Sequence, residues 1–413
     1  MKVSAYQMEA DNQDEICGSA NSENDKNMDQ DAKMDMLPDE MVQHILQYLP
    51  LPSLKVVVQV CQRWGRLGGR PALWAKAWVI LNKENIDSLP EILNTGRLRA
   101  VRRMRIEHAT ARCLHLARHQ PKLQELEVSC PALASVAPTS LASLVAGVQT
   151  AKLWRASVTP DQASAILTSL SAGCRLRHLD LSNTDLSGVR PGLLAGAVTQ
   201  LDTLDLWRTG LGQDHVEALM TGIAKGGRLK SLNLCCNTLY SVAPEVLAKA
   251  ARALETLRLG STLLTGQQAE LLLASISSDA SLLRSLDISN NNLSSVEPGL
   301  LAAAVAGLES LELWKTQLTP AQLKTVFEAA SEGCRLQRLS IGHTPVWSVE
   351  RGLVARVARR LTLRMECVPL SSRQIEAVVR ILYGGTDSNQ PDVESKFPLY
   401  SIISGDYMLK CYH

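Results

Sequence analysis

Most of the chain follows one recurring pattern of leucines, LxxLxL, in which the last two leucines flank a single, mostly polar residue. Alternation of apolar and polar residues with a period of two is typical of a strand that is buried on one face. Eleven segments carry this pattern or a weaker form of it. Their central apolar residues are Met104, Leu126, Ala151, Leu179, Leu204, Leu232, Leu257, Leu286, Leu311, Leu339 and Leu363. The sequence therefore predicts eleven short strands.

The spacing of these strands distinguishes the chain from an ordinary globular domain. Most consecutive central residues lie alternately about 25 and 28 residues apart, and whole phrases return: VTPDQASAILTSLSAGCRL at Val158 is echoed by LTPAQLKTVFEAASEGCRL at Leu318. The segments between strands, such as residues 213–224 and 267–276, carry apolar residues at helical spacing. Such units bury their apolar faces only by stacking on one another. The pattern predicts a parallel sheet backed by helices.

A polar residue recurs just after each of the regular strands, at Thr184, Thr209, Asn237, Thr262, Asn291, Thr316 and Thr344. Backbone groups at a bend between stacked coils would otherwise be buried without a partner. We expect these side chains to bond the backbone of the adjacent coil.

The region before the repeats, residues 37–78, shows shorter helical patterns. A first helix begins near Pro38 and ends at Pro50 and Pro52. Ser53 is the expected N-cap of a second helix whose apolar stripe runs to Trp64. A third turn carries Leu73, Trp74 and Trp78. Residues 37–78 are therefore expected to form a small helical domain.

The two ends of the chain differ from the rest in composition. Residues 1–35 hold nine acidic residues against three lysines and few large apolar residues, so we expect them to be a disordered acidic tail. Residues 386–413 hold four aromatic residues, and we expect this C-terminal tail to pack on the last coil or fold back toward the sheet.

Composition limits the function. The formal net charge of +2 gives no global field that would attract nucleic acid. The most apolar stretches, such as residues 299–308, are too short to span a bilayer. Ten cysteines without a CxxC pair fit a reducing cytoplasm or nucleus. No catalytic motif is found, so we expect no enzymatic activity, cofactor or metal, and we interpret Cys113, His115 and His119 as a helix face.

The N-terminal helical segment resembles the F-box motif. Leu37, Pro38 and Glu40 match the opening Leu-Pro-x-Glu of the family. The later Val-Cys-x-x-Trp and Leu-Trp pairs correspond to Val60, Cys61, Trp64, Leu73 and Trp74. The family often has an Asp-Leu pair where this chain has Ser53 and Leu54.

The repeats resemble leucine-rich repeats of the ribonuclease-inhibitor kind over residues 98–385. The combined resemblance implies an α/β solenoid, a right-handed horseshoe with a parallel concave sheet and convex helices, preceded by a three-helix F-box. It implies an F-box at residues 36–82, a linker at 83–96 and about eleven repeat units at 97–385.

The resemblance also implies a role as the substrate-recognition subunit of an SCF-type ubiquitin ligase, monomeric outside its complex and located in the cytoplasm or nucleus. The F-box would bind a Skp-type adaptor and, through it, the cullin complex. The implied adaptor-binding residues are Leu37, Pro38, Ile45, Leu46, Leu49, Leu54, Val60, Cys61, Trp64 and Trp74. The alternative is a repeat scaffold or ribonuclease-inhibitor-like binder that is not part of a ligase, with N-terminal helices that only cap the first coil.

The outward side chains of the concave sheet are the expected site of substrate binding. Three tryptophans fall in one register there, each followed by a basic residue, and Trp and Arg are enriched in interface hot spots. Equally, the tryptophans could cover aliphatic neighbours or have been copied with the duplicated unit. The predicted substrate-binding residues are Trp154, Arg155, Asp180, Asp205, Trp207, Arg208, Arg258, Asp287, Glu312 and Trp314.

Overall fold

The structure is a computed structural model, and it describes residues 37–49, 51–76, 78–82, 100–107, 111–154, 156–170, 174–277 and 280–365. Contacts along the chain group it into two units, Met1–Leu73 and Trp74–His413. The predicted tails and the predicted linker lie outside the described residues.

Short helices make up the described part of the first unit. They are α1 (Asp39–Leu46), α2 (Leu51–Val60) and α3 (Gln62–Gly68), and a further helix, α4 (Pro71–Lys76), spans the boundary between the units. The carboxylate of Asp39 joins α1 to α3 through Arg63 at 3.0 Å and Arg66 at 2.9 Å. Val42 and Leu46 of α1 are fully buried. The helical domain that the sequence predicts is present.

Two details of this unit differ from the sequence-based expectation. The predicted second helix is divided at Cys61, where the backbone is extended (φ −157°, ψ 170°), so that α3 begins one residue later. The predicted cap, Ser53, lies inside the first turn of α2 rather than before it. Pro52 is tolerated at that position because the amide groups of a first helical turn have no partner within the helix.

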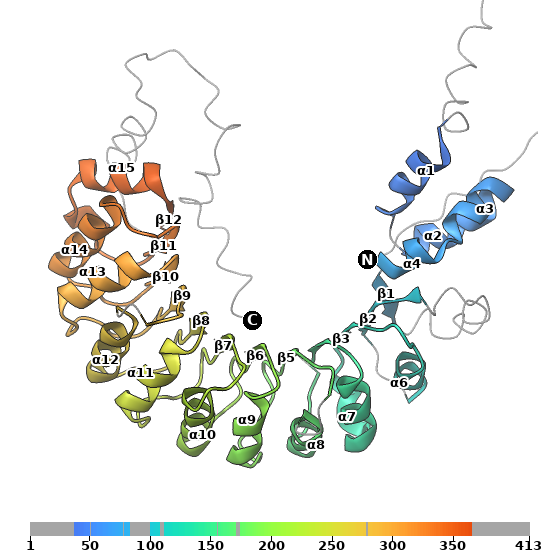
Figure 1. Cartoon of the computed structure of the whole chain (residues 1–413), viewed down its shortest axis with the longest axis horizontal. Helices are drawn as coiled ribbons and strands as arrows, with labels where there is room; N and C mark the ends of the chain where they lie inside the picture. Colours follow the sequence, from blue (N-terminus) through green and yellow to red (C-terminus); the bar gives the residue numbers. More distant parts are fainter. Residues whose placement is uncertain are drawn as a thin grey trace, which may run out of the picture. The chain divides into compact units, whose positions relative to one another are not determined.

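The second unit is built on one parallel sheet of twelve strands, and strand order follows chain order throughout (Figure 1). The strands are β1 (Trp78–Leu81), β2 (Arg103–Ile106), β3 (Glu125–Val128), β4 (Thr150–Lys152), β5 (His178–Asp180), β6 (Thr203–Asp205), β7 (Ser231–Asn233), β8 (Thr256–Arg258), β9 (Ser285–Asp287), β10 (Ser310–Glu312), β11 (Arg338–Ser340) and β12 (Thr362–Arg364). Each strand pairs with its neighbours in sequence. This is the topology of a solenoid.

The register of the sheet confirms the predicted repeat. Met104 lies opposite Leu126, Leu126 opposite Ala151, and Ala151 opposite Leu179. The same residue-by-residue match continues through all eleven predicted central residues to Leu363. Since a one-residue slip would turn every leucine outward, this register follows from the LxL pattern.

One strand was not predicted. Residues Trp78–Leu81, interpreted from the sequence as part of the F-box, form β1 and pair with β2. They carry no LxxLxL motif, but Val79 and Leu81 are buried while Trp78 and Ile80 are only half-buried. The solenoid therefore begins inside the range predicted for the F-box.

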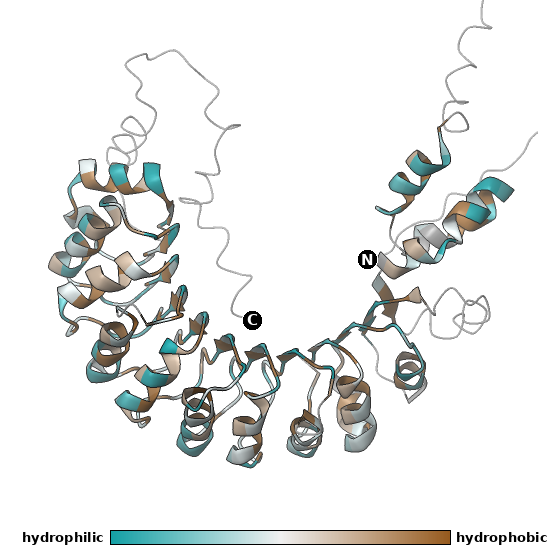
Figure 2. Cartoon of the chain, in the orientation of Figure 1, coloured by the Kyte–Doolittle hydropathy of each residue, from teal (hydrophilic) through white to brown (hydrophobic). Residues whose placement is uncertain are grey.

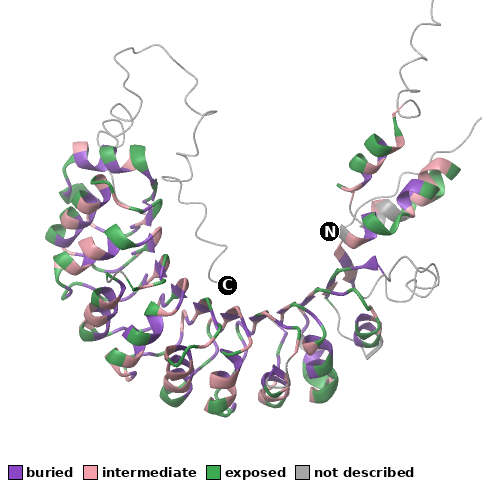
Figure 3. Ribbon diagram, viewed as in Figure 1, coloured by how far each residue is buried: buried purple, intermediate pink, exposed green. Residues whose placement is uncertain are grey.

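Helices cover one face of this sheet, and Figure 1 shows them along the outer side of the curve that the sheet follows within this unit. They are α6 (Ala111–Arg118), α7 (Pro138–Ala146), α8 (Pro160–Leu170), α9 (Pro191–Ala197), α10 (Gln213–Ala224), α11 (Pro244–Arg252), α12 (Gly266–Ile276), α13 (Pro298–Gly307), α14 (Pro320–Ser331) and α15 (Arg351–Arg360). The two return segments named from the sequence correspond to α10 and α12. The core lies between the sheet and the helices. Hydrophobic residues are brown in Figure 2 and buried residues are purple in Figure 3, and both colours are found where the sheet and the helices face each other.

Of the polar residues predicted to bond the adjacent coil, the two asparagines do so. The hydroxyls of four threonines instead donate to a carbonyl of their own coil, three residues earlier: Thr209, Thr262, Thr316 and Thr344. The Asn237 side-chain oxygen accepts hydrogen bonds from the backbone amides of Thr209 (3.1 Å) and Leu211 (3.2 Å). Its amide donates to the carbonyls of Leu206 (2.7 Å) and Leu234 (3.1 Å). Asn291 repeats this arrangement two units later. Each asparagine thus joins two coils.

A second set of buried polar side chains was missed from the sequence. Gln162, Gln268 and Gln322 stand at the third position of helices that open with threonine, and each side-chain amide donates to two backbone carbonyls of the preceding unit. At Thr265 and Thr319 the pair forms a complete capping box. The recurring phrases TPDQ, TGQQ and TPAQ carried this signal.

Candidate functional site

The outward side chains of the inner face lie in rows across the sheet, and we define two of these rows by residue. The first row is Lys152, Asp180, Asp205, Asn233, Arg258, Asp287 and Glu312, one from each of β4 to β10. The second row lies two residues further along the chain and is Trp154, Ser182, Trp207, Cys235, Gly260, Ser289 and Trp314. Both rows therefore cross seven consecutive strands.

The three tryptophans of the second row follow β4, β6 and β10, which confirms that they share one register. All three are half-buried. The indole nitrogen of Trp154 donates to Glu127 at 3.3 Å. Trp314 meets the His343 ring edge-on at 5.2 Å between centroids, and the Lys315 ammonium lies 5.6 Å from its centroid. That they bind a partner remains a prediction.

Two of the basic residues that follow these tryptophans in the sequence are more exposed than the tryptophans are. Arg208 and Lys315 are exposed and adopt left-handed backbone conformations (φ 51° and 57°) at the bend after the strand. Arg155 lies outside the described residues. Arg258 and Glu312 of the first row are exposed, whereas Asp180, Asp205 and Asp287 are half-buried.

Two carboxylates of the first row share one hydroxyl group. The Ser182 side-chain oxygen lies 2.5 Å from Asp180 Oδ1 and 2.9 Å from Asp205 Oδ1. Asp205 also accepts from the Asn233 side-chain amide at 3.0 Å. Burial and the nearby charge of Asp205 raise the pKa of the Asp180 carboxyl, although its bonds to Ser182 and the charge of Lys152 act against the rise.

Small side chains occupy the second row between Trp207 and Trp314. The thiol of Cys235 accepts a hydrogen bond from the Gly260 amide at 3.1 Å and lies 3.9 Å from Asp287 Oδ2. Burial, followed by the charge of Asp287, raises the pKa of this thiol. Since the thiolate is the reactive form of cysteine, Cys235 is a poor nucleophile.

The first unit presents apolar side chains to solvent. The exposed large apolar residues there are Met41, Ile45, Tyr48, Val56 and Val60, between 38% and 76% exposed. Large exposed apolar patches mark sites of protein association. Ile45 and Val60 are among the residues predicted from the sequence, whereas Met41, Tyr48 and Val56 are not.

The predicted adaptor-binding residues divide by exposure. Those at the surface are Pro38, Ile45, Val60 and Cys61, and the half-buried ones are Leu37, Leu49 and Trp64. Leu46 and Trp74 are 0% and 1% exposed, so both pack in the interior. Adaptor contact by the predicted residues stays a prediction. Leu46 lies one helical turn after the buried Val42, on the inward side of α1. The side chain of Leu54 lies outside the described residues.

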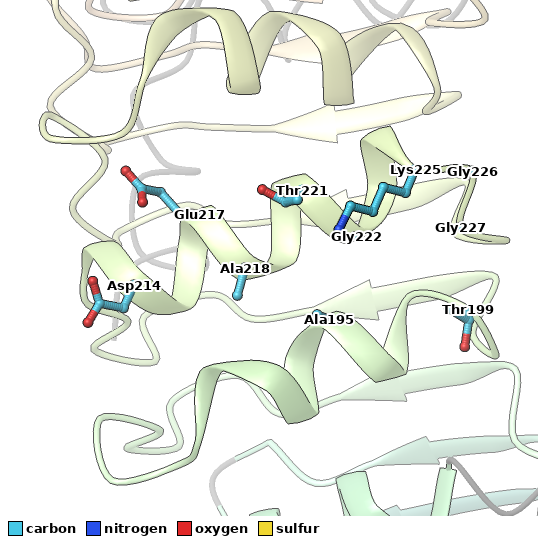
Figure 4. A pocket seen from close by; sticks show the side chains of 10 residues that line it. All are labelled: Ala195, Thr199, Asp214, Glu217, Ala218, Thr221, Gly222, Lys225, Gly226 and Gly227. Atoms are coloured by element: carbon cyan, nitrogen blue, oxygen red, sulfur yellow. The ribbon is translucent and has the colours of Figure 1, made fainter.

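The outer surface carries a hollow between α9 and α10, of about 630 Å³ (Figure 4). Gly222 allows α10 to approach α9 closely, since a Cβ there would lie 3.2 Å from the Ala195 carbonyl oxygen. Asp214 and Glu217 line one end and Lys225 lies toward the other. The hollow is open and lacks a converging set of polar groups, so we assign it no function.

Within the described ranges, no cluster of histidine, cysteine, aspartate or glutamate could hold a metal ion. No described helix has both the length and the apolarity to cross a membrane.

Two family models match parts of the chain. A family model described as F-box-like matches residues 34–78. A model described as Leucine Rich Repeat matches residues 175–197 and 282–303. The chain carries an F-box-like domain followed by leucine-rich repeats. This combination is that of an F-box substrate-adaptor protein, a class that is typically non-catalytic.

Two of the solved structures that match the chain are those of leucine-rich-repeat proteins. A leucine-rich-repeat-containing protein of Legionella pneumophila, LegL7, is 20% identical, with a TM-score of 0.45, over 68% of this chain and 97% of that one. A leucine-rich-repeat protein of Leptospira interrogans is 16% identical, with a TM-score of 0.32, over 70% and 90% of the two chains. No curated protein sequence matches the chain.

Proposed function

We propose that this protein is the substrate-receptor subunit of an SCF-type ubiquitin ligase. In this proposal the F-box-like domain binds a Skp-type adaptor and thereby the cullin complex, and the inner face of the repeats binds the protein to be ubiquitinated. Transfer of ubiquitin takes place on other subunits, so the chain needs no catalytic group of its own.

The observation that supports adaptor binding most directly is the exposed apolar surface of the F-box-like domain. Met41, Tyr48, Val56 and Val60 are all more than half exposed, whereas most leucines of the repeats are buried. At about 25 cal/mol per Å² of apolar area removed from water, covering several such side chains provides several kcal/mol toward binding. An adaptor that covers them would gain this free energy.

The inner face supports the second half of the proposal. Parallel strands about 4.8 Å apart place Trp154 and Trp207 about 10 Å from each other and Trp314 about 20 Å further along. Rigidly held aromatic side chains at these intervals match the extent of a protein ligand. Aromatic residues supply much of the binding energy at protein interfaces.

A binding measurement with purified Skp-type adaptor tests the first half. We expect the full chain to bind the adaptor and the double variant Ile45→Glu/Val60→Glu to lose at least tenfold in affinity, because two buried charges would face an apolar partner. The control is Leu282→Glu, since Leu282 of the repeats is about as exposed as Val60 (58% and 61%). A folded chain that does not bind the adaptor would favour a free-standing repeat scaffold instead.

A further inference from the structure

The inner face between β4 and β10 combines small side chains, tryptophans and carboxylates in a pattern that identifies a class of ligand. This inference rests on the proposed use of that face for protein binding. In the second row, Ser182 stands between Trp154 and Trp207, and Cys235, Gly260 and Ser289 stand between Trp207 and Trp314. Because these side chains are much smaller than tryptophan, we call the two intervals the first recess, at Ser182, and the second recess, at Cys235, Gly260 and Ser289. The first row places Asp180 and Asp205 beside the first recess and Asp287 beside the second.

Beside the first recess, one hydroxyl group faces two carboxylates but has a single hydrogen to donate. A serine hydroxyl carries one hydrogen and donates to one acceptor at a time. The Ser182 hydroxyl nevertheless lies within hydrogen-bond distance of two carboxylates, Asp180 (2.5 Å) and Asp205 (2.9 Å). The hydroxyl can donate to only one of these carboxylates. The other contact is stabilised either by a proton on Asp180 or by a nearby cation that offsets the second negative charge. A ligand that brings a positive charge supplies what this arrangement lacks.

Beside the second recess, a buried polar group has no partner. Ser289 is 7% exposed, and its hydroxyl bonds no described residue. It occupies the register position that Ser182 occupies in the first recess, and its backbone amide donates to Asp287 Oδ1 at 2.9 Å. A buried hydroxyl without a partner costs about 1–3 kcal/mol. The free hydroxyl beside an aspartate is an independent sign that this part of the face is completed by a ligand.

The acidic residues of the inner face differ in whether they form ion pairs. At the N-terminal end of the face, Lys152 bonds Glu125 at 2.9 Å and Arg105 bonds Glu127 at 3.1 Å. In contrast, no ion pair joins Asp180, Asp205 or Asp287 to a basic side chain of the described ranges. The basic and histidine side chains nearest in register are Lys152, His178, Arg208, Arg258, Lys315 and His343. The unpaired negative charge is thus concentrated between β5 and β9.

We propose that the inner face between β4 and β10 binds a basic segment of a partner protein, with a lysine or arginine side chain in each tryptophan-bordered recess. An arginine guanidinium fits best, because it donates to two carboxylates at once and stacks on an indole ring. Asp180 and Asp205 form the acceptor pair of the first recess. Asp287 and the Ser289 hydroxyl form that of the second.

The experiment measures binding of a short fluorescein-labelled peptide of arginine, glycine and serine to the full chain by fluorescence polarisation. The comparison peptide has citrulline in place of each arginine, which keeps the shape and removes the charge. The test variants are Asp180→Asn/Asp205→Asn and Asp287→Asn. The matched control is Asp214→Asn/Glu217→Gln on α10, which removes the same charge as the first variant from the outer surface.

We expect the arginine peptide to bind, the citrulline peptide to bind at least tenfold more weakly, and each inner-face variant to lose about tenfold or more. The outer-surface control should bind as the unaltered chain does. Equal binding of both peptides, an equal loss in the control, or no binding of the arginine peptide would overturn the proposal. Thermal unfolding of each variant verifies that the fold is retained. Adaptor binding, measured on the same samples, tests the proposed function independently of this result.

Discussion

In the repeats, Leu204, Leu232 and Leu257 are completely buried, whereas in the F-box-like unit Tyr48 and Val56 are 76% and 62% exposed. The repeats obtain their burial from one another, because each coil covers the apolar face of the next. The described part of the F-box-like unit is too small to cover all of its apolar side chains. The first unit therefore leaves apolar side chains exposed, where we propose that an adaptor binds, while the second presents a largely polar inner face between its tryptophans.

The largest expected effect is a difference between the two units on truncating an aliphatic side chain. Leu232→Ala should lower the free energy of unfolding by about 3 kcal/mol, because it leaves a cavity between stacked coils. Val56→Ala in the F-box-like unit should change it by less than about 0.5 kcal/mol, because the side chain is already in solvent. Urea titration followed by circular dichroism measures both. A comparable loss in the two variants would break the comparison.

A slightly smaller difference is expected for polar side chains. Asn237→Ala should cost about 2–3 kcal/mol, because four backbone groups of two coils lose their partner. The control is Gln59→Ala in α2 of the F-box-like unit, whose side chain is exposed and should matter little. If both variants unfold at the same urea concentration, the asparagines do not stabilise the stack.

How far the sequence predicts the structure also differs between the units. All eleven predicted strands are present in register, because an LxL pattern leaves only one way to turn both leucines inward. The break at Cys61 and the strand at Trp78–Leu81 were not predicted, because no periodic neighbour constrains these segments. The tryptophan row could be predicted, since register alone fixes it. The Ser182 bridge and the free Ser289 hydroxyl could not, because they depend on side-chain conformation.

The backbone of the repeats gives a third, smaller test. Gly210 stands at a left-handed bend (φ 64°), and Leu263 adopts the same conformation (φ 57°) one super-period later. Gly210→Ala should cost about 1 kcal/mol, because a Cβ disfavours that conformation. Gly192→Ala is the control: it lies in α9 with open space around it and should be neutral or stabilising. Thermal unfolding of the two variants distinguishes a conformational cost from a steric one.

The smallest expected effect concerns the pH dependence of stability at the first recess. Because the pKa of Asp180 is raised in the folded state, the folded chain holds this proton more tightly than the unfolded chain. Its contribution to stability is therefore present below the unfolded value of 3.8 and is lost as the pH rises through the folded value. Asp180→Asn should be more stable than the unaltered chain at pH 7, with the difference falling toward zero in acid. Denaturant titrations at both pH values measure the difference, and a constant one would contradict this account.

Hydrogen exchange of the full chain, with and without a purified Skp-type adaptor, tests most directly whether the two units have separate binding roles. The account predicts that the adaptor slows exchange in α1 and α2, where the exposed apolar side chains lie, and leaves the twelve strands of the sheet unchanged. Slower exchange across β4 to β10 on adding the adaptor, or no change in α1 and α2, would contradict it.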